Sequence, residues 1–263
     1  MEIFGYLAAV LIGVSLGLIG GGGSILTVPV LVYLFHINPV LATTYSLFIV
    51  GITSLTGGFG YYRRKLVEFR AVWLFGLSSI ITVFLARRFI LPAIPSNITI
   101  WGFTMHKNML LMVVFALLML YSSYSIITCR NCREEEAVTD TTKKSIQLVI
   151  NGLLTGLVTG LLGAGGGFLI IPVLVLFLRL SMKRAVGTSL VIIALNSLLG
   201  FLFSTDHDAI NWEQMLIITA VSILGIFAGN RLSEYIDGER IKKIFGIFVL
   251  CMAVFILVRE LVL

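Results

Sequence analysis

Eight apolar segments alternate with short polar stretches along the whole chain. Two of them, at 3–35 and 145–178, are longer than the roughly 20 residues with which one helix crosses a bilayer. Each has a glycine cluster in its middle, GLIGGGGS at 17–24 and GLLGAGGG at 160–167. Because glycine is a poor helix former, we predict that each long segment consists of two helical pieces joined at the glycines. The other segments, each near the length of one span, lie at 39–61, 70–91, 108–128, 185–204, 212–230 and 241–261.

The two long segments belong to an internal repeat whose equivalent residues are 143 positions apart (172 minus 29). At this offset PVLV at 29–32 meets PVLV at 172–175, and ATTYSL at 42–47 meets AVGTSL at 185–190. No gap is needed before the loop around 92–106, so the repeat predicts two halves. The predicted boundaries are 1–128 for the N-terminal repeat, 129–144 for a polar linker and 145–263 for the C-terminal repeat.

The charges of equivalent loops indicate that the two halves are inverted. YYRRKLVEFR at 61–70 is rich in arginine and lysine, whereas its counterpart STDHDAINWE at 204–213 carries acidic residues. Conversely, LFHINPV at 34–40 has no lysine or arginine, and its counterpart FLRLSMKRA at 177–185 has three. Basic loops stay in the cytoplasm, so equivalent loops should face opposite sides of the membrane.

Inversion requires an odd number of membrane crossings in each half. Three ordinary spans satisfy this requirement, so the broken segment should enter and leave from one side as a helical hairpin. The scheme places both termini outside and the central linker in the cytoplasm. Arg87 and Arg88 do not fit it, because they fall at the outer end of their span. Either they snorkel toward the membrane surface or the scheme is wrong.

Composition identifies the lipid bilayer as the surroundings of this fold. The chain is 58% hydrophobic and 12% charged, with a mean hydropathy of +1.05, whereas soluble domains have about 25% charged residues. We therefore predict an all-α polytopic membrane protein of two inverted repeats, each a glycine-broken helical hairpin followed by three transmembrane helices. The net charge of +6 comes from basic residues in short loops, where they set orientation and do not indicate nucleic-acid binding.

The glycine breaks predict a binding site. A half-helix that begins inside the membrane exposes unpaired backbone N–H groups and a partial positive charge, which suit an anion. Two such ends at matched positions of an inverted repeat indicate the central site of a transporter. The alternative, close helix packing, explains spaced glycines such as Gly13 and Gly17 better than consecutive ones. The substrate-binding residues expected at the breaks are Gly21, Gly22, Gly23, Ser24, Gly165, Gly166, Gly167 and Phe168.

Hydroxyl and amide side chains near the starts of the second spans complete the predicted site. Such groups suit a small oxyanion, although serine and threonine also bond to carbonyl groups of their own helix. The two copies differ, since Thr44 is equivalent to Gly187, so a fully symmetric site is not expected. The expected lining residues are Thr44, Ser46, Thr188, Ser189 and Asn196.

No cofactor, metal site or enzymatic activity is expected. Cys129 and Cys132 form a single CxxC motif without a second ligand pair, which is a weak indication of zinc or redox chemistry. Asp206, His207 and Asp208 are better explained as a solvated loop than as metal ligands. No Asp or Glu lies deep in a span, and the histidines lie at segment ends, so no catalytic constellation forms.

The duplicated glycine-rich breaks followed by PVLV, together with ATTYSL, AVGTSL and short basic loops, resemble the TauE/SafE family of sulfite exporters, the toluene-sulfonate uptake permease group. The resemblance covers nearly the whole chain. It implies a transporter of small sulfur-containing anions such as sulfite, sulfonates or sulfoacetate. It fixes neither the substrate nor the direction of transport.

We therefore expect a carrier in the inner membrane that exports a small sulfur-containing anion by alternating access around a midplane site. An anion channel of the same substrate class is the alternative, because the absence of a buried titratable relay in the sequence fits a channel. An intramembrane enzyme would need a convergent cysteine, histidine or carboxylate cluster. The coupling ion and the oligomeric state are not determined by the sequence.

Overall fold

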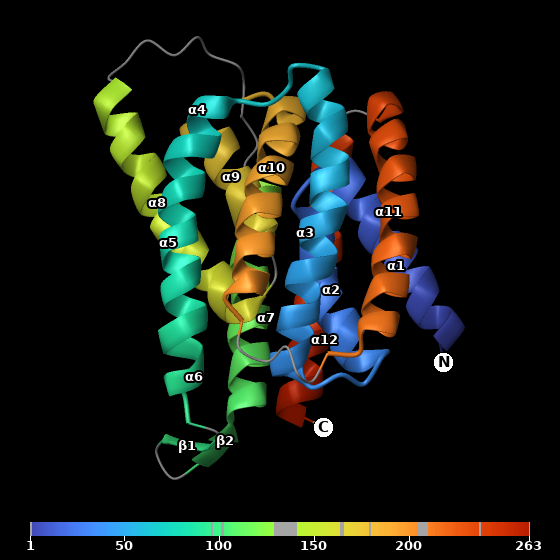
Figure 1. Ribbon diagram of the computed structural model, residues 1–263, viewed down its shortest axis with the longest axis vertical. Coiled ribbons are helices and arrows are strands. Elements are labelled where there is room, and N and C mark those ends of the chain that lie inside the picture. Colours follow the sequence, from blue (N-terminus) through green and yellow to red (C-terminus); the bar gives the residue numbers. More distant parts are fainter. Residues whose placement is uncertain are drawn as a thin grey trace.

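The residues that the structure describes are helical apart from turns, short connections and one short β-hairpin, and most of the helices run along the long axis of the molecule (Figure 1). The structure is a computed structural model. It describes residues 2–95, 97–100, 103–128, 141–163, 166–178, 180–204, 210–236 and 238–262. The cysteine pair, the acidic loop at 206–208 and most of the predicted linker lie outside these residues.

The N-terminal half begins with two short helices and continues with three long helical stretches. α1 (Glu2–Ile19) and α2 (Gly22–Tyr33) are separated by a break, and α3 (Pro39–Arg63) and α7 (Lys107–Thr128) are continuous α-helices. Between α3 and α7 the chain is helical through α4 (Phe69–Ala71), a π-helical turn (Val72–Gly76), α5 (Leu77–Leu85), a second π-helical turn (Ala86–Ile90) and α6 (Leu91–Ala93).

The C-terminal half repeats this order of elements. α8 (Thr141–Leu162) and α9 (Gly167–Phe177) are again separated by a break, and three long helices follow. These are α10 (Met182–Leu202), α11 (Trp212–Tyr235) and α12 (Gly238–Val262). The prediction that both long apolar segments are broken at their glycines is confirmed.

The β-hairpin was not predicted. β1 (Asn97–Ile100) and β2 (Phe103–His106) pair antiparallel, with Asn97 opposite His106. They occupy the region that the repeat leaves as a loop. The sequence NITI contains three β-branched residues in four positions, which favours a strand over a helix once the membrane span has ended.

The chain is a multi-pass membrane protein. Four of the described helical stretches are long and apolar enough to cross a membrane, namely Pro39–Arg63, Phe69–Ala93, Met182–Leu202 and Trp212–Ser233. Large apolar side chains such as Leu55, Trp73 and Leu224 are exposed on their outer faces. Contiguous apolar surface of this kind is stable in lipid and would associate in water.

Equivalent glycines hold each broken helix pair against the opposite half. A Cβ on Gly13 of α1 would overlap the carbonyl oxygen of Ser222 on α11. A Cβ on Gly156 of α8 would overlap the carbonyl oxygen of Ser79 on α5 in the same way. Gly13 and Gly156 are repeat equivalents, and so are Ser79 and Ser222, so the two contacts are equivalent. The spaced glycines therefore provide close helix packing, as predicted.

The equivalent helices α3 and α10 pack against each other in antiparallel order. A Cβ on Gly200, late in α10, would lie 3.3 Å from a methyl group of Leu47, early in α3. A Cβ on Gly58, late in α3, would lie 3.5 Å from Cβ of Leu190, early in α10. In Figure 1, α3 runs from the bottom of the molecule to the top and α10 runs from the top to the bottom. The two halves therefore present their second spans in opposite directions.

Candidate functional site

The two helix breaks meet in the interior of the protein. Gly21 directly precedes α2, and Gly167 is the first residue of α9. They approach so closely that a Cβ on either residue would overlap the backbone of the other. Both are buried. The sequence predicts one central site at the breaks, and the structure brings these two glycines together there.

Glycine conformation ends the first helix of each pair. Gly20 and Gly163 are repeat equivalents, with φ of 75° and 67°. The Gly20 N–H donates to the Leu16 carbonyl at 2.7 Å, and the Gly163 N–H donates to the Thr159 carbonyl at 2.9 Å. Both glycines have the left-handed backbone conformation, which residues with a side chain disfavour. Glycine is therefore required at the end of each first helix.

Each break packs against the second span of the opposite half. A Cβ on Gly20 would lie 3.1 Å from Cα of Val186 on α10, and a Cβ on Gly163 would overlap the backbone of Thr43 on α3. Val186 and Thr43 are themselves repeat equivalents. The N-terminal break therefore lies beside AVGTSL, and the C-terminal break lies beside ATTYSL.

The predicted residues of the breaks are mostly buried where α2 and α9 begin. The Ser24 hydroxyl donates to the Gly21 carbonyl at 2.7 Å, so it closes the first turn of α2 and is not available to a ligand in this state. Gly165 and the side chain of Phe168 lie outside the described residues. Gly22 is the first residue of α2, and Gly23, Gly166 and Gly167 are buried.

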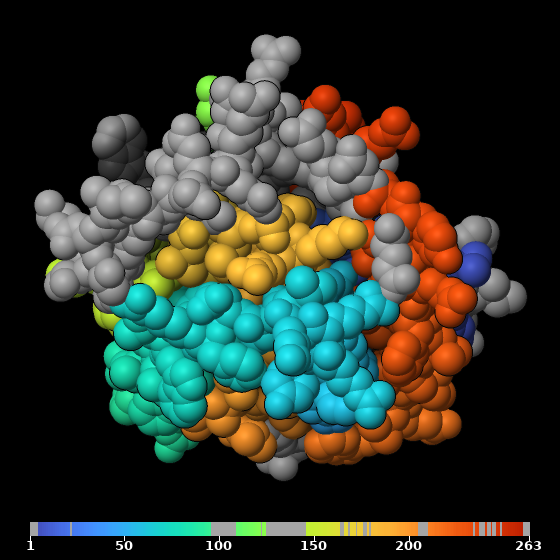
Figure 2. All heavy atoms as spheres, turned by 90° about the horizontal axis from the view of Figure 1, so that it is seen from above, coloured from blue at the N-terminus to red at the C-terminus, as the bar shows by residue number. Residues whose placement is uncertain are grey.

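Thr188 has a structural partner that the sequence reasoning did not anticipate. Its hydroxyl accepts a hydrogen bond from the Glu68 N–H at 2.9 Å, directly before α4. The Asn211 N–H donates to the Tyr45 hydroxyl at 2.6 Å, directly before α11. These two hydrogen bonds are repeat equivalents. In Figure 2 the segment that joins α3 to α4 (cyan) accordingly lies beside the region where α10 begins (gold).

The remaining predicted hydroxyls differ in their availability. Ser46, Thr44 and Ser189 are fully buried. The Ser189 hydroxyl donates to the Val186 carbonyl of its own helix at 2.8 Å, which was the alternative to substrate binding. Among the described residues no hydrogen-bond partner lies near the Ser46 hydroxyl. Ser46 is thus better placed than its equivalent Ser189 to bind a ligand.

Asn196 links α10 to α5. Its Nδ2 donates to the Ser79 hydroxyl at 2.5 Å, and its Oδ1 is buried with no hydrogen-bond partner in the described part of the chain. The amide NH2 group of Asn196 therefore donates within the protein, whereas its carbonyl oxygen could accept a hydrogen bond from a bound water or a protonated ligand.

Arg87 is the functional candidate that sequence reasoning misplaced. Only 1% of it is exposed, and its Nη1 lies 3.5 Å from the Thr44 hydroxyl, so the side chain turns into the protein and does not snorkel outward. It lies in the π-helical turn Ala86–Ile90, whereas its neighbour Arg88 is exposed. The available signal was a basic residue in an apolar span whose repeat equivalent, Asn230, is neutral.

Arg87 is a buried cation that is linked to the C-terminal break through two neighbouring threonines of α3. Burying a guanidinium is costly, and an arginine inside a membrane protein usually marks an ion pathway or a ligand site. Thr44, its hydroxyl partner, directly follows Thr43, which packs on Gly163 of the C-terminal break. This region offers an anion a cation and a hydroxyl group beside the C-terminal break. Among the described residues no group of three potential metal ligands is found.

Comparison with known proteins decides the family. Residues 5–256 match the family model described as Sulfite exporter TauE/SafE, which spans both breaks and nearly all of both halves. The chain belongs to the TauE/SafE family. This confirms the resemblance seen in the repeated motifs, and it makes this TauE/SafE protein a membrane transporter.

Several curated relatives of this TauE/SafE protein are named probable membrane transporter proteins. One from Xylella fastidiosa is 28% identical over 254 residues, covering 95% of this chain and 92% of the relative. YunE of Bacillus subtilis is 26% identical and covers 86% and 85%. One from Methanocaldococcus jannaschii is 33% identical over 114 residues, covering 41% and 43%. No solved structure matches the chain significantly.

Proposed function

We propose that this protein exports small sulfur-containing anions of the sulfite, sulfonate or sulfoacetate type across the inner membrane. The backbone contact between Gly21 and Gly167 is the observation that carries the proposal. The starts of α2 and α9 meet there, and the buried Arg87 is linked to the C-terminal break through Thr44, whose neighbour Thr43 packs on Gly163. The family description, sulfite exporter, supports the substrate class.

The proposed mechanism is alternating access between two inverted repeats. Antiparallel packing of the equivalent helices α3 and α10 supports inversion, because equivalent elements related by an axis in the membrane plane must run in opposite directions. The domain boundaries 1–128 and 145–263 follow from the same repeat. Each break rests on the second span of the other half, so a rocking motion of one half against the other would move both breaks relative to the anion.

We assign the anion to the side of the site where Arg87 and Thr44 lie. Arg87 would supply charge, and the Thr44 hydroxyl would donate to an oxygen of the anion. The equivalent positions in the other half are Asn230 and Gly187, which supply no charge there. The binding site is therefore proposed to be asymmetric although the scaffold is repeated.

A carrier is favoured over an anion channel because the breaks close on each other. Gly21 and Gly167 are buried and in contact, which leaves no room for an ion to pass between them in this state. A channel would need an open path at that point. Saturable counterflow in proteoliposomes, in which unlabelled internal anion accelerates entry of labelled anion, is the expected behaviour of a carrier.

We expect the substrate class to appear in a thermal-shift panel on the purified protein. Sulfite and small sulfonates should raise the melting temperature, since a ligand at about 100 times its Kd stabilises the folded state by about 2.7 kcal/mol. Carboxylates of similar size should have a smaller effect. Stabilisation by the carboxylates alone would remove sulfur anions from the proposal, and the same panel in counterflow assays checks that binding reports transport.

We expect cysteines at Arg70 and Glu213 to be labelled from opposite sides of the membrane. These residues are exposed repeat equivalents at the starts of α4 and α11, and the basic loop should place Arg70 in the cytoplasm. Each cysteine is introduced into a variant whose three native cysteines are replaced by serine. An impermeant maleimide applied to intact cells should then label E213C and not R70C. Both should react after permeabilisation. Labelling of both in intact cells would contradict inversion and the outside placement of the termini.

A further inference from the structure

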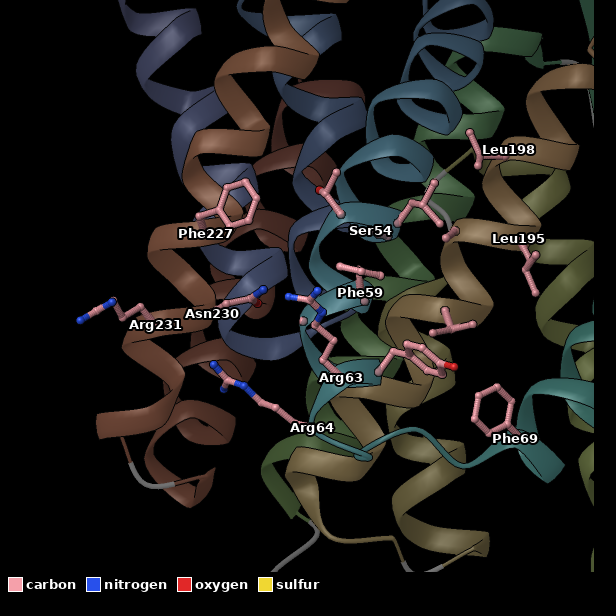
Figure 3. A pocket seen from close by; sticks show the side chains of 17 residues that line it. Ser54, Phe59, Arg63, Arg64, Phe69, Leu195, Leu198, Phe227, Asn230 and Arg231 are labelled. Atoms are coloured by element: carbon pink, nitrogen blue, oxygen red, sulfur yellow. The ribbon is translucent and has the colours of Figure 1, made fainter.

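A groove on the outer surface of the helices lies apart from the helix breaks. It has a volume of about 1170 Å³ and is bounded by α3, α10 and α11 (Figure 3). Its walls are largely apolar, and Leu55, Phe59, Leu195 and Phe227 are exposed along it. In a membrane protein such exposed side chains contact lipid.

One end of the groove is cationic. Arg63 and Arg64 at the end of α3 line this end of the groove, and so does Arg231 on α11. All three arginines are exposed. Figure 3 shows Arg63 and Arg64 extending from α3 toward α11, whereas Arg231 extends away from α3. The Arg63 guanidinium lies 5.0 Å from the centre of the Phe59 ring, which holds the charge over the apolar wall. No acidic side chain is found among the described residues that line the groove.

Two buried polar atoms on residues of the groove wall have no hydrogen-bond partner in the described part of the chain. They are the hydroxyl of Ser54 and Oδ1 of Asn230, whose Nδ2 donates to the Gly57 carbonyl at 3.4 Å. One can donate and the other can accept. Both atoms are buried, so they do not face a ligand in the groove.

We propose that this groove binds an anionic phospholipid. The phosphate lies between Arg63 and Arg64, and an acyl chain follows the apolar wall toward Leu195 and Leu198. Basic pockets between helices at the cytoplasmic face are suited to acidic lipid head groups, and the groove adds the apolar extension that a small anion would not use. A transported anion is disfavoured in this groove, because moving a charge along an apolar wall is costly.

The proposal can be tested by measuring lipid binding to the purified protein by native mass spectrometry. Phosphatidylglycerol and phosphatidylcholine with identical acyl chains serve as the two probes. Two arginines that each contribute about fivefold, or about 1 kcal/mol, give an expected preference of about 25-fold for phosphatidylglycerol. The R63Q/R64Q variant should lose most of this preference while still binding phosphatidylcholine.

Two further variants separate the groove from a general effect of surface charge. R88Q removes the exposed repeat equivalent of Arg231 at the other end of the molecule, and it should leave the preference unchanged. G60L should weaken binding of both lipids, because a longer side chain at this position can enter the groove. Outside the local helix backbone, the one described atom within 4 Å of a Cβ at Gly60 is Nδ2 of Asn230, at 3.8 Å.

An unchanged preference in R63Q/R64Q, or an equal loss in R88Q, would overturn the proposal. Displacement of phosphatidylglycerol by millimolar inorganic phosphate would also overturn it, because the site would then be one for free anions. So would a dimer that forms through this face in place of lipid binding, detected as loss of the dimer in G60L. None of these outcomes depends on which anion the protein transports.

Discussion

Arg87→Gln is expected to lower the rate of anion transport by about 30-fold or more. Truncating one partner of a buried, charged hydrogen bond costs about 2–5 kcal/mol, and here the partner left unpaired would be the bound anion. Arg87→Lys keeps the charge and loses the planar fork, so it should retain part of the activity. Uptake in proteoliposomes at several anion concentrations would show the loss as a higher KM, a lower rate or both.

The exposed neighbour provides a matched control for this variant. Arg88→Gln removes the same charge one position along the chain, outside the protein interior, and should transport normally. A purely structural role for Arg87 would lower the melting temperature of the Gln variant and leave the stabilisation by sulfite intact. The proposal requires the reverse, in which stabilisation by the anion is lost. A folded Arg87→Gln protein with normal KM would remove Arg87 from the site.

Alanine at Gly21 or Gly167 is expected to lower transport by about 100-fold, because even small displacements of binding groups have effects of that size. A single methyl group at either position would overlap the backbone of the opposite break. Overpacking of this kind also destabilises by about 1–3 kcal/mol, so the melting temperature should fall. Transport assays and thermal unfolding of both variants measure the two effects.

Gly76→Ala is the control for these two substitutions. It adds the same methyl group to a buried glycine, and outside the local helix backbone no described atom lies within 4 Å of the new Cβ. Alanine is also the better helix former. It should fold and transport at least as well as the original protein. Normal transport by folded Gly21→Ala and Gly167→Ala proteins would show that the contact between the breaks is not part of the mechanism.

Much of the fold could be predicted because it depends on local signals. Apolar length predicts the spans, and consecutive glycines predict the breaks at Gly20 and Gly163. The spacing of Gly13 and Gly156 predicts close packing, since a small-residue stripe has few other uses in a membrane helix. The offset between the halves then predicts which contacts are duplicated.

The chemistry of the site could be predicted only in part, because it depends on long-range contacts. No pattern in AVGTSL shows that Thr188 accepts a hydrogen bond from Glu68, which is 120 positions away. Arg87 looked like a surface residue because a regular helix places it near the end of its span. The π-helical turn changes the direction of the side chain, and a period of 3.6 residues does not reveal such a turn.

The duplicated contacts between the halves have the form of an isologous interface. Gly13 meets Ser222 across it, and their equivalents Gly156 and Ser79 meet with the roles of the halves exchanged. Two separate copies of one half would make the same pair of contacts in a two-fold symmetric dimer. These two contacts are therefore reciprocal, as the contacts across a two-fold axis are. The two sides of this arrangement differ in charge, because the buried Arg87 of one half corresponds to the neutral Asn230 of the other.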